Sequence, residues 1–211
     1  MDIQVATSHY AADSYNYKPR YYSYVEQIME TANLKPSHVT EIGLGNGFTT
    51  RGLRDFGIEV TTVDFDATLC PDIVASVCSI SLPDNSTDGS LCFQVLEHLP
   101  FEQFPIGLKE LARISRGWVF LSLPDCRSSF RVDLARGWSE IKYWQRMLNN
   151  FPPRKPQMHQ FDGQHYWEIG KAATPENLVL DTIRKAGLRV ERHYRLHLNP
   201  YHHFFLLYKE T

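Results

Sequence analysis

Cysteine is scarce in this sequence and long apolar runs are absent, and both absences narrow the kinds of protein that it can encode. The 211 residues hold four scattered cysteines, with no Cys-x-x-Cys pair and no disulfide framework like those of small secreted domains: Cys70, Cys78, Cys92 and Cys126. No apolar run approaches the roughly 18 residues that cross a bilayer, and the first residues form no basic and then apolar leader. The sequence therefore predicts a cytoplasmic protein with no membrane contact.

An excess of charge of one sign is also missing. The chain has 22 Lys and Arg against 24 Asp and Glu, for a net charge of −2, and it contains no basic run. Because a basic patch is the electrostatic footprint of nucleic-acid binding, no nucleic-acid partner is expected. Apolar residues at 43% and charged residues at 22% are ordinary for a globular protein, and the length suits one domain, residues 1–211. The oligomeric state is left open.

Short β-prone runs alternate with helical patterns from residue 38 onward. The expected strands cover residues 39–42, 58–63, 73–77, 90–95 and 118–123, and the expected helices cover residues 20–33, 48–56 and 102–115. This alternation predicts a parallel sheet, because parallel neighbours need a crossover. A further helix opens at Thr174–Glu176 and ends at Gly187. The runs 188–198 and 203–209 follow, and the link between them is too short for a crossover, so they are antiparallel if they pair.

A glycine-rich turn joins the first expected strand to the following helix. Its glycines are spaced Gly43-x-Gly45-x-Gly47, so a ligand can approach the backbone where the helix begins. The dinucleotide fingerprint G-x-G-x-x-G would need a glycine where Phe48 stands. Asp64 ends the next expected strand, where a carboxylate accepts hydrogen bonds from both ribose hydroxyls of a nucleoside. The turn therefore favours a nucleoside ligand other than a dinucleotide.

The residues around this turn carry a family resemblance. The segment Glu41–Gly47 resembles the first motif of class I S-adenosylmethionine-dependent methyltransferases, and Phe93–Leu99 resembles the fourth-strand signature of their type 11 subgroup. Residues 38–123 follow the order of that subgroup. The resemblance implies an α/β, Rossmann-like fold with a mostly parallel seven-stranded sheet, an antiparallel C-terminal hairpin and helices on both faces.

The resemblance also implies which residues bind the cofactor, S-adenosyl-L-methionine. Asp64 would accept hydrogen bonds from the ribose, Glu41 would hold the turn or the cofactor's amino group, and Phe65 would lie beside the adenine. The backbone of Gly43, Gly45 and Gly47 would face the methionine portion of the cofactor. Cys78 and Ser79 would lie against the adenine, and Gln94 and Val95 would border the sulfonium. The third strand departs from the family pattern, because Cys78-Ser79 offers no acidic side chain near the adenine.

Four segments divide the expected domain. Residues 1–35 form an N-terminal lid or helix rich in tyrosine, 36–124 the cofactor-binding half, 125–173 an insertion without a regular pattern, and 174–211 the last helix and hairpin. Long insertions in α/β sheets are usually functional, so residues 125–173 are expected to recognise the substrate. Whether the N-terminal tyrosines pack a helix or cover a ligand stays open.

Catalysis needs little beyond alignment of the acceptor and, for an oxygen acceptor, a base. The candidates are His165, which is favoured, His98 and Asp125. His98 equally suits a residue that satisfies backbone groups at a helix start, and Asp125 suits a plain turn residue. Four possible metal ligands recur at three-residue intervals, at His159, Asp162, His165 and Glu168, but Gly163 opposes a regular helix and no metal is predicted.

The expected acceptor is a small molecule or a glycan, methylated on oxygen or nitrogen. An RNA or protein methyltransferase is an alternative, although Gln94–Glu97 stands where amino-methylating nucleic-acid enzymes often carry an Asn/Asp-Pro-Pro-aromatic motif. A non-catalytic scaffold that binds the cofactor for a partner subunit is another. An NAD enzyme is disfavoured by Phe48 and by the terminal hairpin.

Overall fold

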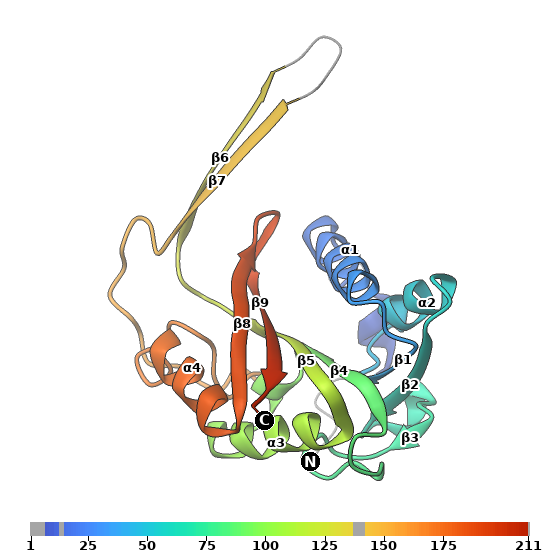
Figure 1. Cartoon of the computed structure of the whole chain (residues 1–211). Helices are drawn as coiled ribbons and strands as arrows, with labels where there is room; N and C mark the ends of the chain where they lie inside the picture. Colours follow the sequence, from blue (N-terminus) through green and yellow to red (C-terminus); the bar gives the residue numbers. More distant parts are fainter. Residues whose placement is uncertain (1–6, 13–14, 137–141, 211) are drawn as a thin grey trace.

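A seven-stranded sheet forms the centre of the computed structural model, which describes residues 7–12, 15–136 and 142–210 (Figure 1). The strand order is β3-β2-β1-β4-β5-β9-β8. The first five strands in this order are parallel to one another, and β9 is antiparallel to both β5 and β8. The bounds are β1 His38–Ile42, β2 Glu59–Asp64, β3 Ile73–Val74, β4 Thr87–Phe93, β5 Ser115–Pro124, β8 Leu188–Leu196 and β9 Asn199–Lys209. The predicted parallel sheet with an antiparallel C-terminal hairpin is confirmed.

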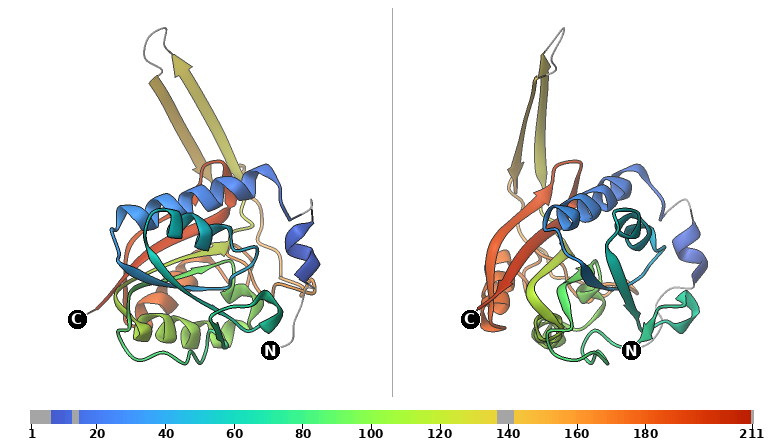
Figure 2. Two further views of the ribbon diagram at one scale, coloured as in Figure 1. Left: turned by 90° about the vertical axis from the view of Figure 1, so that its right-hand side faces the viewer. Right: turned by 45° about the vertical axis from the view of Figure 1, so that its right-hand side comes forward.

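Helices cover both faces of this sheet, as predicted (Figure 2). One face carries α1 (Lys18–Asn33) and α2 (Phe48–Asp55), and the other carries α3 (Phe104–Ile114) and α4 (Glu176–Lys185). Four short 3-10 helices lie in the connections: η1 Thr7–Ala11, η2 Ala67–Leu69, η3 Leu96–His98 and η4 Phe101–Gln103. Within the described residues, no helix combines the length and the apolar character needed to cross a membrane.

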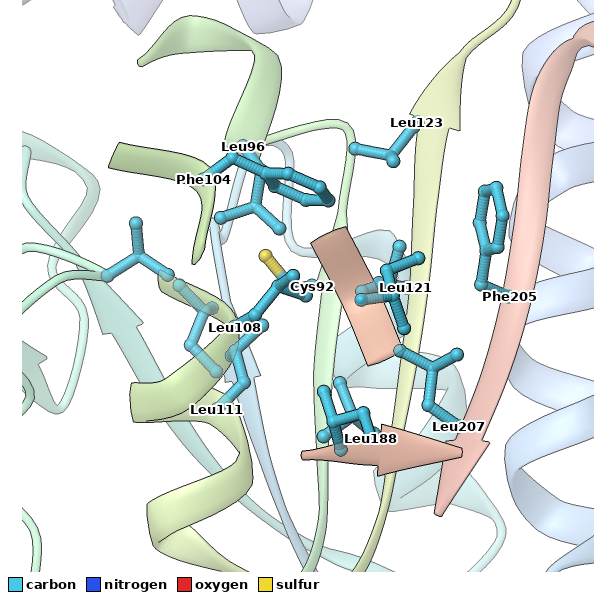
Figure 3. Packing of buried hydrophobic residues seen from close by; sticks show 14 of the residues in the cluster. Cys92, Leu96, Phe104, Leu108, Leu111, Leu121, Leu123, Leu188, Phe205 and Leu207 are labelled. Atoms are coloured by element: carbon cyan, nitrogen blue, oxygen red, sulfur yellow. The ribbon is translucent and has the colours of Figure 1, made fainter. Parts of the chain in front are cut away.

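The period-two alternation of the strands builds two separate cores. Leu91 and Phe120 belong to the cluster under α1 and α2, whereas their neighbours Cys92 and Leu121 belong to the cluster under α3 and α4. Figure 3 shows the second cluster, in which leucines of α3 meet Cys92 and Leu121 from the sheet. Burying each such leucine contributes about 1.5–3 kcal/mol relative to leaving it exposed. The sheet is thus a rigid base for the loops at its carboxyl edge.

The strand order reverses beside β1, which has β2 on one side and β4 on the other. In open α/β sheets, ligands bind outside the carboxyl ends of the strands at such a switch point. The glycine-rich turn follows β1 and Asp64 ends β2, so the fold brings both predicted features to this crevice.

The insertion departs from the sequence prediction, which expected no regular pattern there. Strands β6 (Ser129–Arg136) and β7 (Lys142–Asn149) form an antiparallel hairpin that extends away from the domain (Figures 1 and 2). The remaining part of the insertion runs back to the sheet, where Ile169 pairs with Asp125 at the end of β5. The insertion therefore has two parts with different surroundings.

Candidate active site

The glycine-rich turn adopts a backbone conformation that favours glycine. Gly43, Gly45 and Gly47 all have positive φ angles, of 88°, 52° and 66°. A Cβ atom on Gly43 would lie 2.2 Å from Cγ2 of Val95, so the turn also packs closely against the end of β4. The N–H of Gly43 donates to the carbonyl of Val63 at 2.9 Å, which ties the turn to β2.

Asp64 is held in place by the turn that it faces. Its Oδ2 accepts a hydrogen bond from the N–H of Leu44 at 2.8 Å, and its Oδ1 accepts one from the N–H of Asp66 at 2.9 Å. Burial raises the pKa of Asp64, and these backbone hydrogen bonds oppose the rise. Each carboxylate oxygen keeps a further lone pair, so the group can still accept two hydrogen bonds from a ligand.

Glu41 lies beneath the turn, at the end of β1. It is buried, and its Oε2 accepts a hydrogen bond from Oγ1 of Thr50 in α2. Burial raises the pKa of Glu41 to about 7, against the hydrogen bond from Thr50. The contact joins the strand before the turn to the helix after it.

One continuous pocket of about 180 Å³ runs from this turn to the start of β9. It is lined by nine of the residues singled out in the sequence: Glu41, Gly43, Gly45, Asp64, Phe65, Gln94, Val95, His98 and His165. Four others lie outside the lining: Gly47, Cys78, Ser79 and Asp125. On the expected adenine side, Ala75 and Val77 line the pocket, while the sulfur of Cys78 lies 3.9 Å from Oε1 of Gln103.

A family model described as a methyltransferase domain matches residues 40–121, from β1 through most of β5. The match assigns residues 40–121 to a methyltransferase domain. Over these residues the predicted type 11 domain is confirmed, and with it the prediction of an S-adenosylmethionine-dependent enzyme. No curated protein matches the sequence.

Solved structures support the fold of the methyltransferase. The 1,6-didemethyltoxoflavin-N1-methyltransferase of Burkholderia thailandensis, solved with 1,6-didemethyltoxoflavin and S-adenosylhomocysteine, has a TM-score of 0.60 and 16% identity over 88% of this chain and 76% of its own. The glycopeptide N-methyltransferase MtfA, in complex with S-adenosylhomocysteine, has a TM-score of 0.58 and 12% identity over 87% and 88%. The magnesium protoporphyrin IX methyltransferase of Synechocystis, with bound S-adenosylmethionine, has a TM-score of 0.56 and 15% identity over 91% and 79%. The predicted cofactor agrees with these three neighbours.

The far end of the methyltransferase's pocket collects imidazoles from three segments. His98 ends η3, His165 lies in the returning part of the insertion, and His202 lies on β9. The rings of His98 and His165 meet edge to face, 5.1 Å apart. Burial lowers the pKa of His98 to about 4 and that of His202 to about 3, so both are neutral at pH 7.

The N-terminal segment adds residues that the sequence interpretation did not assign. Tyr10 and Tyr15 line the pocket, and the hydroxyl of Tyr15 would lie 3.2 Å from a Cβ on Gly45. The guanidinium of Arg20 lies 3.9 Å from the ring centre of Tyr15, and its buried Nε has no hydrogen-bond partner among the described residues. The crowding of tyrosines was the one signal in the sequence, and it was compatible with packing as well as with a lid.

Asp125 lies apart from the pocket, in a buried group of charges. Its Oδ2 contacts Nη2 of Arg127 at 2.6 Å, Nδ1 of His203 at 2.9 Å and Nε of Arg195 at 3.5 Å. Although burial acts to raise the pKa of Asp125, these partners lower it to about 2. A carboxylate held ionised in this way is a weak proton acceptor, so Asp125 has no part in the mechanism proposed below.

The histidine-rich stretch is irregular in structure and includes possible metal ligands. Asp162, His165 and Glu168 each offer an atom within 4.8 Å of the others, as do His165, Glu97 and His98. The fourth predicted candidate, His159, directs its Nε2 to the carbonyl of His165 at 2.8 Å. Asp162 accepts hydrogen bonds from backbone N–H groups, and Glu168 is paired with His165 and Lys171. The absence of a metal stays a prediction.

Proposed function

We propose that the chain transfers a methyl group from S-adenosylmethionine to a small molecule held at the imidazole-lined end of the pocket. The observation that carries this proposal is the continuity of one pocket from the glycine turn and Asp64 to His98 and His165. A donor bound at the turn and an acceptor bound at the imidazoles would then share one pocket. The net charge of −2 gives no support to a polymeric nucleic acid as acceptor.

Each part of the donor has a suitable partner in the pocket. We assign the ribose hydroxyls to Asp64 and the adenine to the space between Phe65 and Val77. The sulfonium would lie beside Gln94 and Val95, which follow β4. The methionine portion would lie along Gly43 and Gly45, with its amino group near Glu41, whose carboxylate also fixes the turn. Cofactor contacts by Gly47, Cys78 and Ser79 stay predictions, and these three residues lie outside the pocket lining.

Arg20 is our candidate for the carboxylate of the donor's methionine. The side chain lines the same pocket, its guanidinium lies over Tyr15, and its buried Nε has no hydrogen-bond partner among the described residues. A partly buried cation of this kind is stabilised by an anionic ligand. The segment that includes Tyr10, Tyr15 and Arg20 would thus close over the donor, which is the lid alternative for the N-terminal tyrosines.

The residues act on the reaction mainly by alignment and by excluding water. The bound donor supplies an electrophilic methyl group on a sulfonium that becomes neutral as the acceptor attacks in line. Gln94, which directly follows β4 and has an unusual positive φ of 56°, is fixed by hydrogen bonds to Ser122 at 3.0 and 3.2 Å. We propose that this strained residue defines the edge against which the reacting groups are aligned.

The test is calorimetry with S-adenosylhomocysteine and with NAD, followed by transfer of labelled methyl groups to a panel of small molecules. We expect S-adenosylhomocysteine to bind and NAD not to bind. Failure to bind S-adenosylhomocysteine would refute the proposal. Binding without transfer to any acceptor would favour the cofactor-binding scaffold instead, and transfer to RNA or protein alone would favour the polymer-modifying alternative.

A further inference from the structure

A buried carboxylate lies directly behind His165. Oε1 of Glu168 is 3.1 Å from Nδ1 of His165, and the side chain of Glu168 is largely buried. Within the described residues, Nδ1 is thus occupied by a carboxylate, while the ring itself lines the pocket. A carboxylate at Nδ1 fixes the tautomer and leaves Nε2 with its lone pair, as an orienting acid does for a general base.

Tyr201 strengthens this arrangement from another element. Its hydroxyl donates to the same Oε1 of Glu168 at 2.5 Å, and its own carbonyl accepts the N–H of Asp125 at 2.8 Å. Glu168 is anchored on the other side as well, because its carbonyl accepts a hydrogen bond from Oγ1 of Thr174 at 2.6 Å. The neighbouring Trp167 is buried and donates from Nε1 to the carbonyl of Leu99 at 3.1 Å. The carboxylate is therefore fixed by contacts from several parts of the chain.

We propose that Glu168 and Tyr201 position His165 as the base of an O-methyl transfer, and that the acceptor is a small molecule with a weakly acidic hydroxyl. The inference rests on the proposed function. The acceptor oxygen forms a bond to the donor's methyl carbon as its proton passes to Nε2 of His165. The bond from methyl carbon to sulfur breaks, and its electron pair stays on the sulfur. His165 then releases the proton to solvent.

The choice of a hydroxyl follows from what each acceptor requires. A neutral amine already has an available lone pair, so it gains little from an imidazole held by a carboxylate. A hydroxyl must lose its proton as it attacks, and the imidazolium that forms is stabilised by Glu168. The neutral ring of His202 lines the same end of the pocket and can donate one hydrogen bond to an acceptor oxygen, whereas the single N–H of neutral His98 is donated from Nδ1 to the carbonyl of Gln164 at 3.0 Å.

The electrostatic surroundings of His165 give the inference a measurable signature. Burial lowers the pKa of His165, but the hydrogen bond to Glu168 and the charge of Glu97 outweigh it, so the pKa is raised. The titratable groups around His165 and its carboxylate come from η3, the returning insertion and β9: Glu97, His98, His159, Asp162, Glu168, Lys171, Tyr201 and His202. Because the base must be neutral, activity should rise with pH through the pKa of His165.

The experiment is an NMR titration of the His165 ring in the full chain with S-adenosylhomocysteine bound. The signal is assigned by its loss in His165→Gln. We expect the Nδ1–H tautomer in the wild-type chain, and a pKa that falls by about one unit in Glu168→Gln, because a neutral amide no longer stabilises the imidazolium. Tyr201→Phe keeps the carboxylate and should change the pKa less. The control Glu102→Gln, on the exposed part of η4, should leave it unchanged.

A spectroscopic acceptor probe tests the chemical class. In the presence of S-adenosylhomocysteine, 4-nitrophenol bound to the wild-type chain should show the nitrophenolate band at lower pH than in solution, and Glu168→Gln should weaken that band. The amine 4-nitroaniline should show no such change. Three results would overturn this inference and leave the proposed function intact, provided that S-adenosylhomocysteine still binds. They are an Nε2–H tautomer of His165, an unshifted pKa of His165 in Glu168→Gln, and the absence of a nitrophenolate band. Loss of S-adenosylhomocysteine binding by the wild-type chain would refute the proposed function.

Discussion

The carboxylate of Asp64 has two tasks in the proposed site, since it holds the turn through Leu44 and offers lone pairs to the ribose. Asp64→Asn should weaken S-adenosylhomocysteine binding roughly tenfold to a hundredfold, because a hydrogen bond to a charged group contributes about 1.5–3 kcal/mol. Calorimetry measures the change, and Asp55→Asn on the exposed end of α2 is the matched control. An affinity within a factor of two of the wild type would remove Asp64 from the site.

Gly43 illustrates why the turn requires glycine for two separable reasons. Both Gly43 and Gly57 have positive φ, but only at Gly43 would a Cβ meet another side chain, at 2.2 Å from Val95. Gly57→Ala should therefore reduce the free energy of unfolding by about 1 kcal/mol from backbone strain. Gly43→Ala should reduce it by about 2–4 kcal/mol, because overpacking adds to the strain. Urea denaturation of both variants measures the difference, and equal effects would show that Val95 yields without cost.

At the residue scale, the residues that the sequence singled out include more of the pocket lining around the glycine turn than of the lining at the imidazole end. The donor residues come from short contiguous motifs whose spacing survives folding, such as the turn and Asp64. Tyr201 and Arg20 are distant from those motifs, and only the folded chain brings them to the same pocket. His165 and Glu168 are three residues apart in the sequence, and the structure shows that they are paired. The sequence alone did not show whether these residues bind a metal, share a helix face or include a base.

The hairpin of β6 and β7 is the element that sequence patterns missed most clearly. Among the described residues, its strands form ladder pairs only with each other, for example Phe130 opposite Leu148. Its contacts with the main sheet are made by side chains, such as that of Asp133 with His197 just after β8. Both side chains are exposed, at 49% and 39%. None of the hairpin side chains whose burial the structure describes is buried. Without a buried face there, the usual alternation of apolar and polar residues is weak, and that alternation is the main sequence signal for a strand.

Removal of this hairpin should leave the donor site intact. Ser129 and Asn149 are paired, so an Asn-Gly turn can replace residues 130–148. Among the described residues, neither strand contributes to the two cores or to the pocket lining. We expect unchanged S-adenosylhomocysteine affinity and a Tm within about 4 °C of the wild type, measured by calorimetry and by thermal unfolding. A large loss of donor affinity would mean that the hairpin supports the pocket. Within the described part of the insertion, Gln164 and His165 line the pocket, and we propose that these two residues contact the acceptor.

For the whole molecule, alternating strands and helices together with two limits on connections predicted the parallel sheet and the antiparallel last pair, whereas the seven-stranded Rossmann-like fold was what the family resemblance implied. A parallel neighbour needs a crossover, and the short link before β9 allows none, which fixed the antiparallel ending. The charged group around Asp125 was not predictable, because Arg127, Glu176, Arg195 and His203 come from four separate segments. These contacts join β5, α4, β8 and β9, so they stabilise the arrangement of the C-terminal elements.

The pH dependence of stability is set by two kinds of buried group, carboxyl groups whose pKa is raised and histidines whose pKa is lowered. The pKa values of Glu41 and Glu97 are raised by burial to about 7, so between about pH 4.3 and 7 the folded chain holds extra protons and its stability falls as pH rises. The pKa values of His98 and His202 are lowered by burial to about 4 and 3, so below about pH 6.5 the unfolded chain holds extra protons and stability falls as pH falls. The two slopes oppose each other between about pH 4.3 and 6.5. The lowered pKa of His203 adds to the histidine slope below about pH 6.5, and the raised pKa of Asp64 adds to the opposing slope above about pH 3.9. The raised pKa of His165 acts only above about pH 6.5, where stability falls as pH rises.

Below about pH 4.3 the balance ends. Glu41 and Glu97 are then protonated in both states, whereas the histidine effect continues and the carboxylates of Asp125 and Glu168, with pKa values held near 2 by their partners, begin to favour the unfolded chain. We therefore expect a free energy of unfolding that is nearly constant between pH 4.5 and 6.5 and falls steeply below it, as measured by urea denaturation at a series of pH values. Glu97→Gln removes one of the groups that make stability fall as pH rises. The free energy of unfolding of this variant should therefore rise with pH between pH 4.5 and 6.5. His202→Gln should show the opposite slope. A flat plateau in both variants would show that these buried groups do not titrate as their surroundings indicate.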